Sequence, residues 1–127
     1  MRFFTILLFA SSLIVGCSEP FHGNPEITSV VKNEGFQAKR VARLEIDGMM
    51  CEVGCVTKVK KELLELEGVS NVIMDFDSDR GTNFANVEYE IKTISLFSIY
   101  NAVNSIADGK LYGVKAVVDT EYRPDAE

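Results

Sequence analysis

The chain has 127 residues, of which 46% are hydrophobic and 25% charged, a composition ordinary for one globular domain with appendages. Its formal net charge of −6 argues against a nucleic-acid-binding surface, which would be basic. A solvated acidic face is the simplest interpretation of that charge, and a basic partner is the alternative. Three cysteines cannot all pair within one chain, so at least one is free, modified or metal-bound.

The N-terminus has the pattern of a secretion signal. Arg2 precedes an apolar run over residues 3–15, the length of a signal-peptide core and shorter than the ~20 residues that span a bilayer. The segment Ile14-Val15-Gly16-Cys17 resembles the lipobox of bacterial lipoproteins, in which the peptide is cut before the cysteine and the cysteine is lipidated. This resemblance implies a signal peptide over residues 1–16, a lipid on Cys17, and an extracytoplasmic protein on the cell membrane or outer membrane. An uncleaved N-terminal anchor is the alternative.

Residues 17–38 read as a tether between that anchor and the domain. They contain two prolines and two glycines, which favour a mobile segment. Val30 and Val31 could dock on the domain as a short added element. His22 is the only histidine of the chain, and we interpret it as a solvated linker residue rather than a metal ligand.

The domain begins with a strand and a helix. Residues 41–47 alternate apolar and polar side chains, which predicts a strand with one face in water. From residue 55 to residue 67 the apolar period becomes that of an amphipathic helix, and Gly68 stands just past its end. The apolar residues that carry these two patterns are Ala42, Leu44, Ile46, Val56, Val59, Leu63 and Leu66.

A hairpin follows the helix. Val72, Met74 and Phe76 alternate with polar or exposed positions, and residues 84–89 alternate in the same way. Between these two runs, residues 77–81 have the composition of a turn. The two runs are therefore predicted to pair as antiparallel strands.

The last third of the chain predicts a second helix and a final strand. Thr93 can cap a helix over residues 94–107. Residues 111–118 form the expected last strand, with Val114, Ala116 and Val118 on one face. From Asp119 onward we expect a frayed tail.

The order strand, helix, strand, strand, helix, strand defines the fold. It predicts an α+β, ferredoxin-like βαββαβ domain, with a four-stranded antiparallel sheet and two helices on one face. We place this domain at residues 39–120 and a tail at residues 121–127.

The segment Gly48-Met49-Met50-Cys51-Glu52-Val53-Gly54-Cys55 joins the first strand to the first helix and carries the candidate chemistry. Thiolates are soft ligands that favour Cu(I), Zn and similar ions, and a helix N-terminus lowers the pKa of a thiol. On a helix, residues four apart lie on one face with Cβ atoms ~5–6 Å apart. A disulfide needs Cβ atoms ~3.5–4.5 Å apart, so it would require an unwound first turn, which Gly54 permits. The alternative to a functional pair is that Cys51 and Cys55 are simply two small residues buried in the core.

Several positions carry a resemblance to a known family. Gly48-Met49-Met50-Cys51 ends the first strand, Cys55-Val56 opens the helix, and Gly68-Val69 follows it. With the strand order, these residues make the chain from about Val41 to Val118 similar to the heavy-metal-associated domain, a family of copper chaperones, P-type ATPase modules and periplasmic mercury-binding proteins. One difference lies in the site itself: the family has two residues between its cysteines and this chain has three.

The resemblance implies a set of site residues. Cys51 and Cys55 are the expected metal ligands, and Met50 could add a thioether. Met49 is the expected core anchor under the loop. Near the site, Lys110 is the first candidate to neutralise a two-thiolate Cu(I) complex and Tyr112 the second, while a solvated Lys110 is equally compatible with the sequence.

The function predicted from the sequence is transfer of a soft metal outside the cytoplasm, without enzymatic activity. Cu(I) is the expected ion, and Hg(II) or Zn(II) are alternatives. Expected partners are the membrane, through Cys17, and a metal-transporting membrane protein or metallochaperone, with no nucleic acid. Two other functions stay open: a thiol/disulfide redox protein using Cys51 and Cys55, and an accessory domain that has kept the fold and lost the metal.

Overall fold

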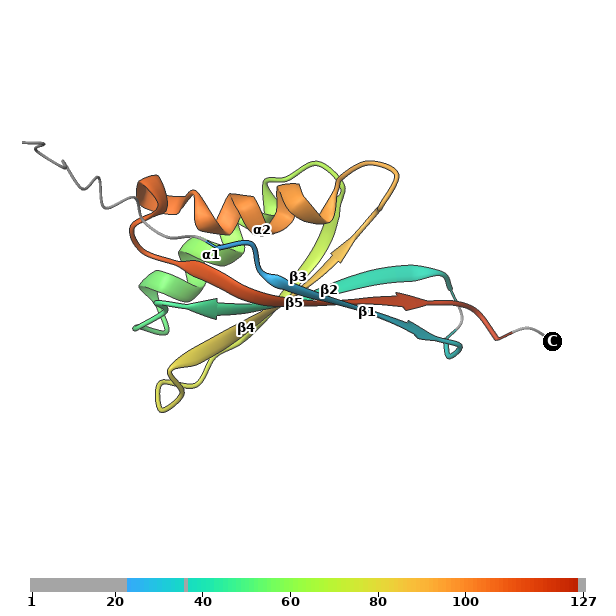
Figure 1. The fold of residues 1–127 in the computed structure, drawn as a ribbon, viewed down its shortest axis with the longest axis horizontal. Coiled ribbons are helices and arrows are strands. Elements are labelled where there is room, and N and C mark those ends of the chain that lie inside the picture. Colours follow the sequence, from blue (N-terminus) through green and yellow to red (C-terminus); the bar gives the residue numbers. More distant parts are fainter. Residues whose placement is uncertain (1–22, 36, 126–127) are drawn as a thin grey trace, which may run out of the picture.

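The computed structural model of the chain describes residues 23–35 and 37–125. Within them the order of elements is β1-β2-α1-β3-β4-α2-η1-β5, where η1 is a 3₁₀ helix (Figure 1). The predictions for the signal peptide, Cys17 and His22 lie outside the described residues. The bounds are β1 Glu26–Lys32, β2 Lys39–Asp47, α1 Gly54–Leu64, β3 Val69–Asp75, β4 Thr82–Tyr89, α2 Leu96–Asn104, η1 Ile106–Gly109 and β5 Gly113–Tyr122.

The strands form one mixed sheet in the order β1-β5-β2-β4-β3. The four strands β5, β2, β4 and β3 pair antiparallel, as the sequence predicts, and both helices lie over one face of the sheet (Figure 1). The prediction of four strands is wrong by one, because β1 adds a fifth that runs parallel to β5. The segment predicted as a tether therefore holds a strand, in which the β-branched Val30 and Val31 suit an extended backbone.

The core fills the space between this sheet and its two helices. Val59 and Leu63 on α1 are fully buried, as are the inward positions of β2 and β4, which confirms the predicted apolar periods. The predicted hairpin is also confirmed, since Val72 of β3 lies opposite Val87 of β4. The fully buried apolar residues are Ala42, Leu44, Ile46, Val59, Leu63, Ala85, Val87, Ile99 and Val103.

The ends of α2 differ from the prediction. Ser95, not Thr93, is its N-cap, because the Ser95 hydroxyl accepts a hydrogen bond from the backbone N–H of Ser98 at 3.2 Å. The helix ends at Asn104, and Ala107 in η1 then takes a positive φ of 52°, which stops helical propagation. None of the helices in the described ranges has the length and apolar character needed to cross a membrane.

A β-bulge in β5 changes which residues of that strand face the core. Glu45 of β2 pairs with Ala116 and Ile46 pairs with Val114, so Lys115 is an extra residue in the ladder. The predicted single apolar face of Val114, Ala116 and Val118 is therefore wrong. Beyond the bulge Val117 is buried, whereas Val118 is 37% exposed.

The bulge also places a carboxylate inside the molecule. Asp119 is only 6% exposed. It accepts a 2.8 Å hydrogen bond from the Tyr89 hydroxyl and forms a 3.5 Å ion pair with Arg40. Burial first, and then the bond to Asp119, raise the pKa of Tyr89 to about 12. The tail predicted from Asp119 onward is thus wrong, since β5 continues to Tyr122.

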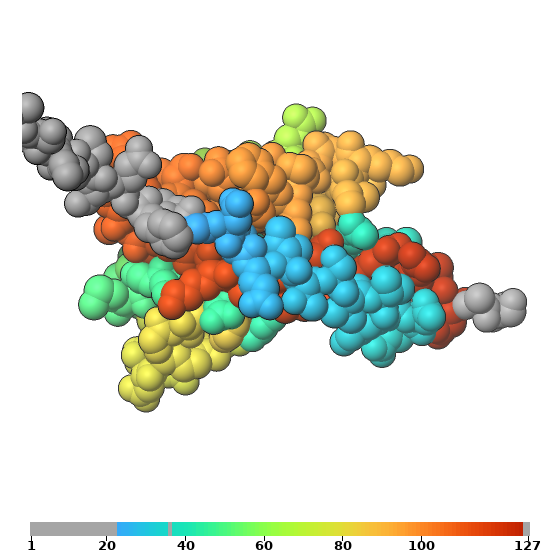
Figure 2. Space-filling view, viewed as in Figure 1, coloured from blue at the N-terminus to red at the C-terminus, as the bar shows by residue number. Residues whose placement is uncertain are grey.

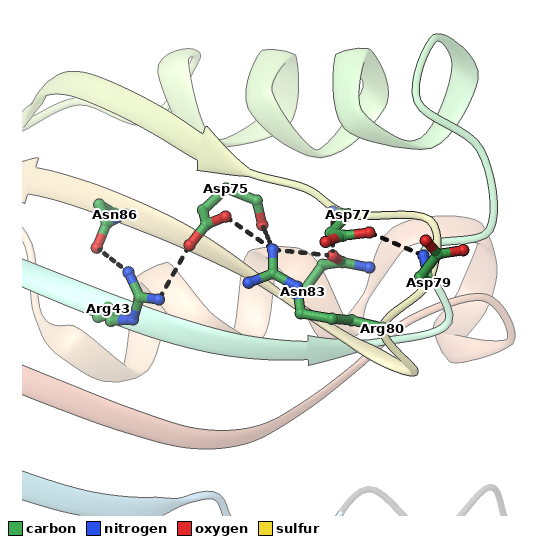
Figure 3. A network of polar contacts seen from close by, with 7 residues as sticks. All are labelled: Arg43, Asp75, Asp77, Asp79, Arg80, Asn83 and Asn86. Carbon is green, nitrogen blue, oxygen red and sulfur yellow. Dashed lines mark hydrogen bonds and ion pairs between the residues drawn. The ribbon is translucent and has the colours of Figure 1, made fainter.

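The other face of the sheet carries a network of ion pairs (Figure 3). Asp75 on β3 forms ion pairs with Arg80 at 2.7 Å and with Arg43 at 3.1 Å. Hydrogen bonds from Arg80 and then Arg43 hold the pKa of Asp75 below its ordinary value. Arg43 also lies 4.1 Å from the centre of the Phe84 ring. These residues are partly exposed, and the network closes the β3–β4 turn rather than forming a site.

Candidate metal centre

The loop between β2 and α1 is fixed at two points before it reaches the cysteines. Gly48 has a φ of +94°, and a Cβ at this position would lie 2.1 Å from the backbone oxygen of Leu111. Only glycine allows that approach. The next residue, Met49, is 5% exposed and belongs to the core. The loop therefore lies directly against the segment that leads into β5.

The two thiols meet where α1 begins. The sulfur atoms of Cys51 and Cys55 are 3.2 Å apart, and both cysteines are free. The backbone N–H of Cys55 points at the Cys51 sulfur at 3.4 Å. Val53, the N-cap residue, makes no side-chain cap bond, so the Cys51 sulfur takes up one of the N–H groups that a helix N-terminus leaves without a partner.

Gly54 makes room for the Cys51 sulfur. A Cβ on Gly54 would lie 3.2 Å from that sulfur, which is tighter than most Cβ contacts, so the sulfur would have to shift by a few tenths of an ångström. The φ of Gly54 is not positive, so glycine is favoured here by space rather than by backbone conformation. The absence of a side chain at the last residue of the spacer thus leaves the Cys51 sulfur free to lie against the start of α1.

Tyr112 lies next to the second thiol. The residue is 4% exposed, and its hydroxyl is the strongest influence on the charge of the Cys55 sulfur. The hydroxyl of Tyr112, followed by the contact with Cys51 and by backbone N–H groups, lowers the pKa of Cys55 from 9.0 to about 7. Burial, and then the interaction with Cys55, raise the pKa of Tyr112 to about 12, so its hydroxyl keeps its proton across the neutral range.

The other predicted site residues are placed around this pair. Met50 is 87% exposed, and its side chain lies in solvent beside the loop. Lys110 is exposed, and its backbone N–H donates a hydrogen bond to the backbone oxygen of Ala107. Lys110 and Tyr112 are the two candidates to neutralise a metal complex held by the thiols. The structure brings Tyr112 next to Cys55 and leaves Lys110 at the surface.

The donor set is small, and it suits a soft ion. In the part of the chain that the structure describes, no group of three or more His, Cys, Asp or Glu side chains gathers to hold a metal. A metal–sulfur bond of about 2.3 Å would separate two sulfurs by about 3.8 Å in tetrahedral and about 4.6 Å in linear geometry. The 3.2 Å pair must therefore open by about 1 Å to hold an ion. Exposed loop residues such as Val53 can accommodate that opening.

Comparison with known proteins identifies the domain. Residues 43–104 match the model of the heavy-metal-associated domain family. These residues are a heavy-metal-associated domain. Among solved structures, the chain is similar to oxidized MerP from Ralstonia metallidurans CH34, at 24% identity, a TM-score of 0.41, and coverage of 59% of this chain and 97% of that one. A comparison with curated proteins finds no match.

The matched range covers the thiol pair but not every residue around it. Both thiols fall inside the heavy-metal-associated domain, while Tyr112 and the strand β1 lie outside residues 43–104. Sequence reasoning underrated Tyr112 because its contact depends on the approach of Gly48 to Leu111 across 63 residues of chain. The available signal was the tyrosine itself, standing just before an apolar strand and after a glycine–lysine turn.

Proposed function

We propose that this protein is a membrane-tethered, extracytoplasmic carrier that binds one Cu(I) ion through Cys51 and Cys55 and passes it on by exchange of thiolate ligands. The observation that carries the proposal is the pair of sulfurs 3.2 Å apart at a helix N-terminus, one of them with a pKa of about 7. A sulfur that is about half deprotonated at pH 7 can bind a metal without a strong base.

The ligand set favours Cu(I) as the cargo. Cu(I) accepts few, soft ligands, whereas structural zinc takes four protein ligands. Two thiolates leave a Cu(I) complex with one negative charge, which the Tyr112 hydroxyl next to Cys55 stabilises. Hg(II) has the same preference for thiolate and is the second cargo to test.

Exposure of the site fits transfer to another protein. Cys51 is exposed, and Met50 and Val53 beside it are 87% and 81% exposed. An incoming thiolate can therefore reach an ion held by the pair before either sulfur leaves it. The partner we propose is a metal-transporting membrane protein or a soluble metallochaperone.

The test is Cu(I) binding to the reduced protein under anaerobic conditions, against a competing chelator. We expect one Cu(I) per chain. Cys51→Ser and Cys55→Ser should each weaken binding by more than ~100-fold, because each removes a thiolate that would hold the ion. Met50→Ala should weaken binding by less than ~10-fold, because the Met50 side chain lies in solvent. Zero stoichiometry in a folded, reduced protein would reject the metal function and leave the accessory-domain alternative.

The spacing of the cysteines can be tested in the same assay. Deleting Val53 restores the two-residue spacing of the family. We expect tighter Cu(I) binding and slower release to a competing thiol if the inserted residue serves easy transfer. Unchanged affinity together with unchanged release rate would show that the third residue has no role in binding.

The tether is tested separately. We propose that Cys17 carries a lipid, on the basis of Ile14-Val15-Gly16-Cys17. Cys17→Ser should then release the protein from the membrane fraction or block removal of residues 1–16. An unprocessed N-terminus and an unchanged membrane fraction in the wild type would reject this part of the proposal.

One observation also favours a thiol/disulfide redox function. An attacking thiol works best when its pKa lies near the ambient pH, and the pKa of Cys55 is about 7. Mass spectrometry of protein purified anaerobically separates the two functions, because the carrier is recovered as a metal complex or dithiol and the redox protein as a disulfide. Disulfide formation and metal binding both require the two sulfurs to move by about 1 Å, so this distance does not rank the two functions. We rank the redox function second because residues 43–104 match the heavy-metal-associated domain family.

A further inference from the structure

β1 is the terminal strand of the sheet. It pairs with β5 on one side and is the last strand in the order of the described strands. In Figure 2 the blue residues of β1 form part of the visible surface beside β5. Six of its seven residues are exposed, and Val30 is half-buried. Among the residues that the structure describes, no strand pairs with the outer backbone edge of β1, so this edge can accept an additional strand.

This edge lacks the features that usually prevent pairing. Its register with β5 runs without a break from Glu26 opposite Ala116 to Lys32 opposite Tyr122, so no bulge twists it away. It contains no proline and no charge in its interior. Natural edge strands are normally protected by such devices, because an open edge is a template for another chain.

The sequence of β1 is complementary to itself when it is reversed. In an antiparallel pair centred on Ser29, Glu26 lies opposite Lys32 of the partner subunit, and Ile27 lies opposite Val31 of the partner subunit. We infer that two copies of this protein associate through β1, with a two-fold axis at Ser29, so that their two sheets join into one. This inference is independent of the proposed metal function.

Side-chain exposure supports that register. Ile27 is 48% exposed and Val31 is 52% exposed, and both face the side of the sheet on which Val117 is buried. In the paired dimer, Ile27 of each copy would pack against Val31 of the partner subunit, which gives one apolar contact on each side of the axis. A slip of one residue would break both apolar contacts and both charge pairs, so the sequence selects one register.

The arrangement leaves both metal sites accessible. β1 runs parallel to β5, and β5 begins next to Tyr112 at the thiol site. Antiparallel pairing of two β1 strands therefore places the two thiol pairs at opposite ends of the joined sheet. This dimer differs from one bridged by a shared metal, because it needs neither cysteine.

Disulfide cross-linking of the full-length protein in membranes tests the register. In a Cys51→Ser/Cys55→Ser background, Ser29→Cys should give a covalent dimer with diamide, because directly opposed residues of antiparallel strands have Cα atoms about 4.5–5.5 Å apart, within disulfide range. Ile27→Cys together with Val31→Cys should do the same. Ile27→Cys alone should not, since the two equivalent positions would be about 14 Å apart.

Charge reversal gives a matched control. Glu26→Lys and Lys32→Glu should each reduce the Ser29→Cys dimer roughly two- to tenfold, because each change sets two like-charged pairs across the axis. The double variant, which exchanges the charges, should restore it. Equal cross-linking at Ile27 alone and at Ser29 would mean random collision on the membrane and overturn the inference. Failure of Ser29→Cys to cross-link in a folded protein would overturn it as well.

Discussion

Tyr112→Phe removes one hydroxyl next to Cys55 and leaves a ring of nearly the same shape in the core. The hydroxyl of Tyr112 is the largest cause of the low pKa of Cys55, which is about 7 instead of 9.0. Without that hydroxyl the thiolate loses its main stabilising partner, and we expect the pKa of Cys55 to rise toward 9.0. The Cys51 contact and the backbone N–H groups remain and keep part of the effect.

The size of the change follows from the two pKa values. At pH 7 a thiol with a pKa of about 7 is about half thiolate, while one with a pKa of 9.0 is about 1% thiolate. Because the other lowering contacts survive in the variant, we expect an intermediate loss, roughly 3–10-fold in thiolate at pH 7.

The assay is the rate of iodoacetamide alkylation of the reduced protein as a function of pH, with mass mapping of the Cys55 peptide. Alkylation reports the thiolate. The profile of Tyr112→Phe should shift to higher pH, and weaker Cu(I) binding at pH 7 should accompany the shift. Tyr122→Phe is the matched control, since it removes a hydroxyl at the far end of β5. Superimposable profiles for Tyr112→Phe and the wild type would refute the role given to the hydroxyl.

Three further predictions concern stability and the site. Leu63→Ala should lower the free energy of unfolding, measured by urea titration, by about 2–5 kcal/mol, because Leu63 is fully buried. Leu64→Ala, at a residue that is 45% exposed, should lower it far less. Equal losses in the two variants would contradict the core assignment. Gly54→Ala should stabilise the helix by up to ~1 kcal/mol yet weaken Cu(I) binding, since its Cβ would press on the Cys51 sulfur at 3.2 Å; unchanged affinity would contradict this. The reduced protein should gain stability from pH 7 to pH 9, because the folded pKa of Cys55 is about 7 and the unfolded one 9.0, so that the unfolded chain binds more protons in this window. Stability should then fall between pH 10 and pH 12, since Tyr89 and Tyr112 have folded pKa values of about 12; a flat profile in urea titrations across pH would argue against both shifts.

The parts of the fold that follow from local periods could be predicted from sequence. Val59 and Leu63 repeat along one helix, and the alternation over residues 41–47 repeats along one strand, so each pattern is complete within its own element. The strand β1 could not be predicted in this way. Its formation depends on an open edge of β5, which the sequence near residues 26–32 does not show.

The site was predictable to the same extent. The positions of Cys51 and Cys55 at the start of a helix follow from the change of period at residue 55. The contact of Tyr112 with Cys55 depends instead on two distant segments meeting, which Gly48 permits. A pattern of types and spacings carries no information on that meeting, and so Lys110 could not be separated from Tyr112 in advance.

The extra residue in β5 marks a place where this fold does not tolerate a change of length. Deleting Lys115 would turn every later residue of the strand to the opposite side, so that Val118 would face inward and Asp119 outward. Tyr89 and Arg40 would then lose their common partner. A residue gained or lost between the two cysteines changes only a loop that is held at Gly48 and Met49. The register of the sheet therefore does not depend on how many residues separate the two cysteines.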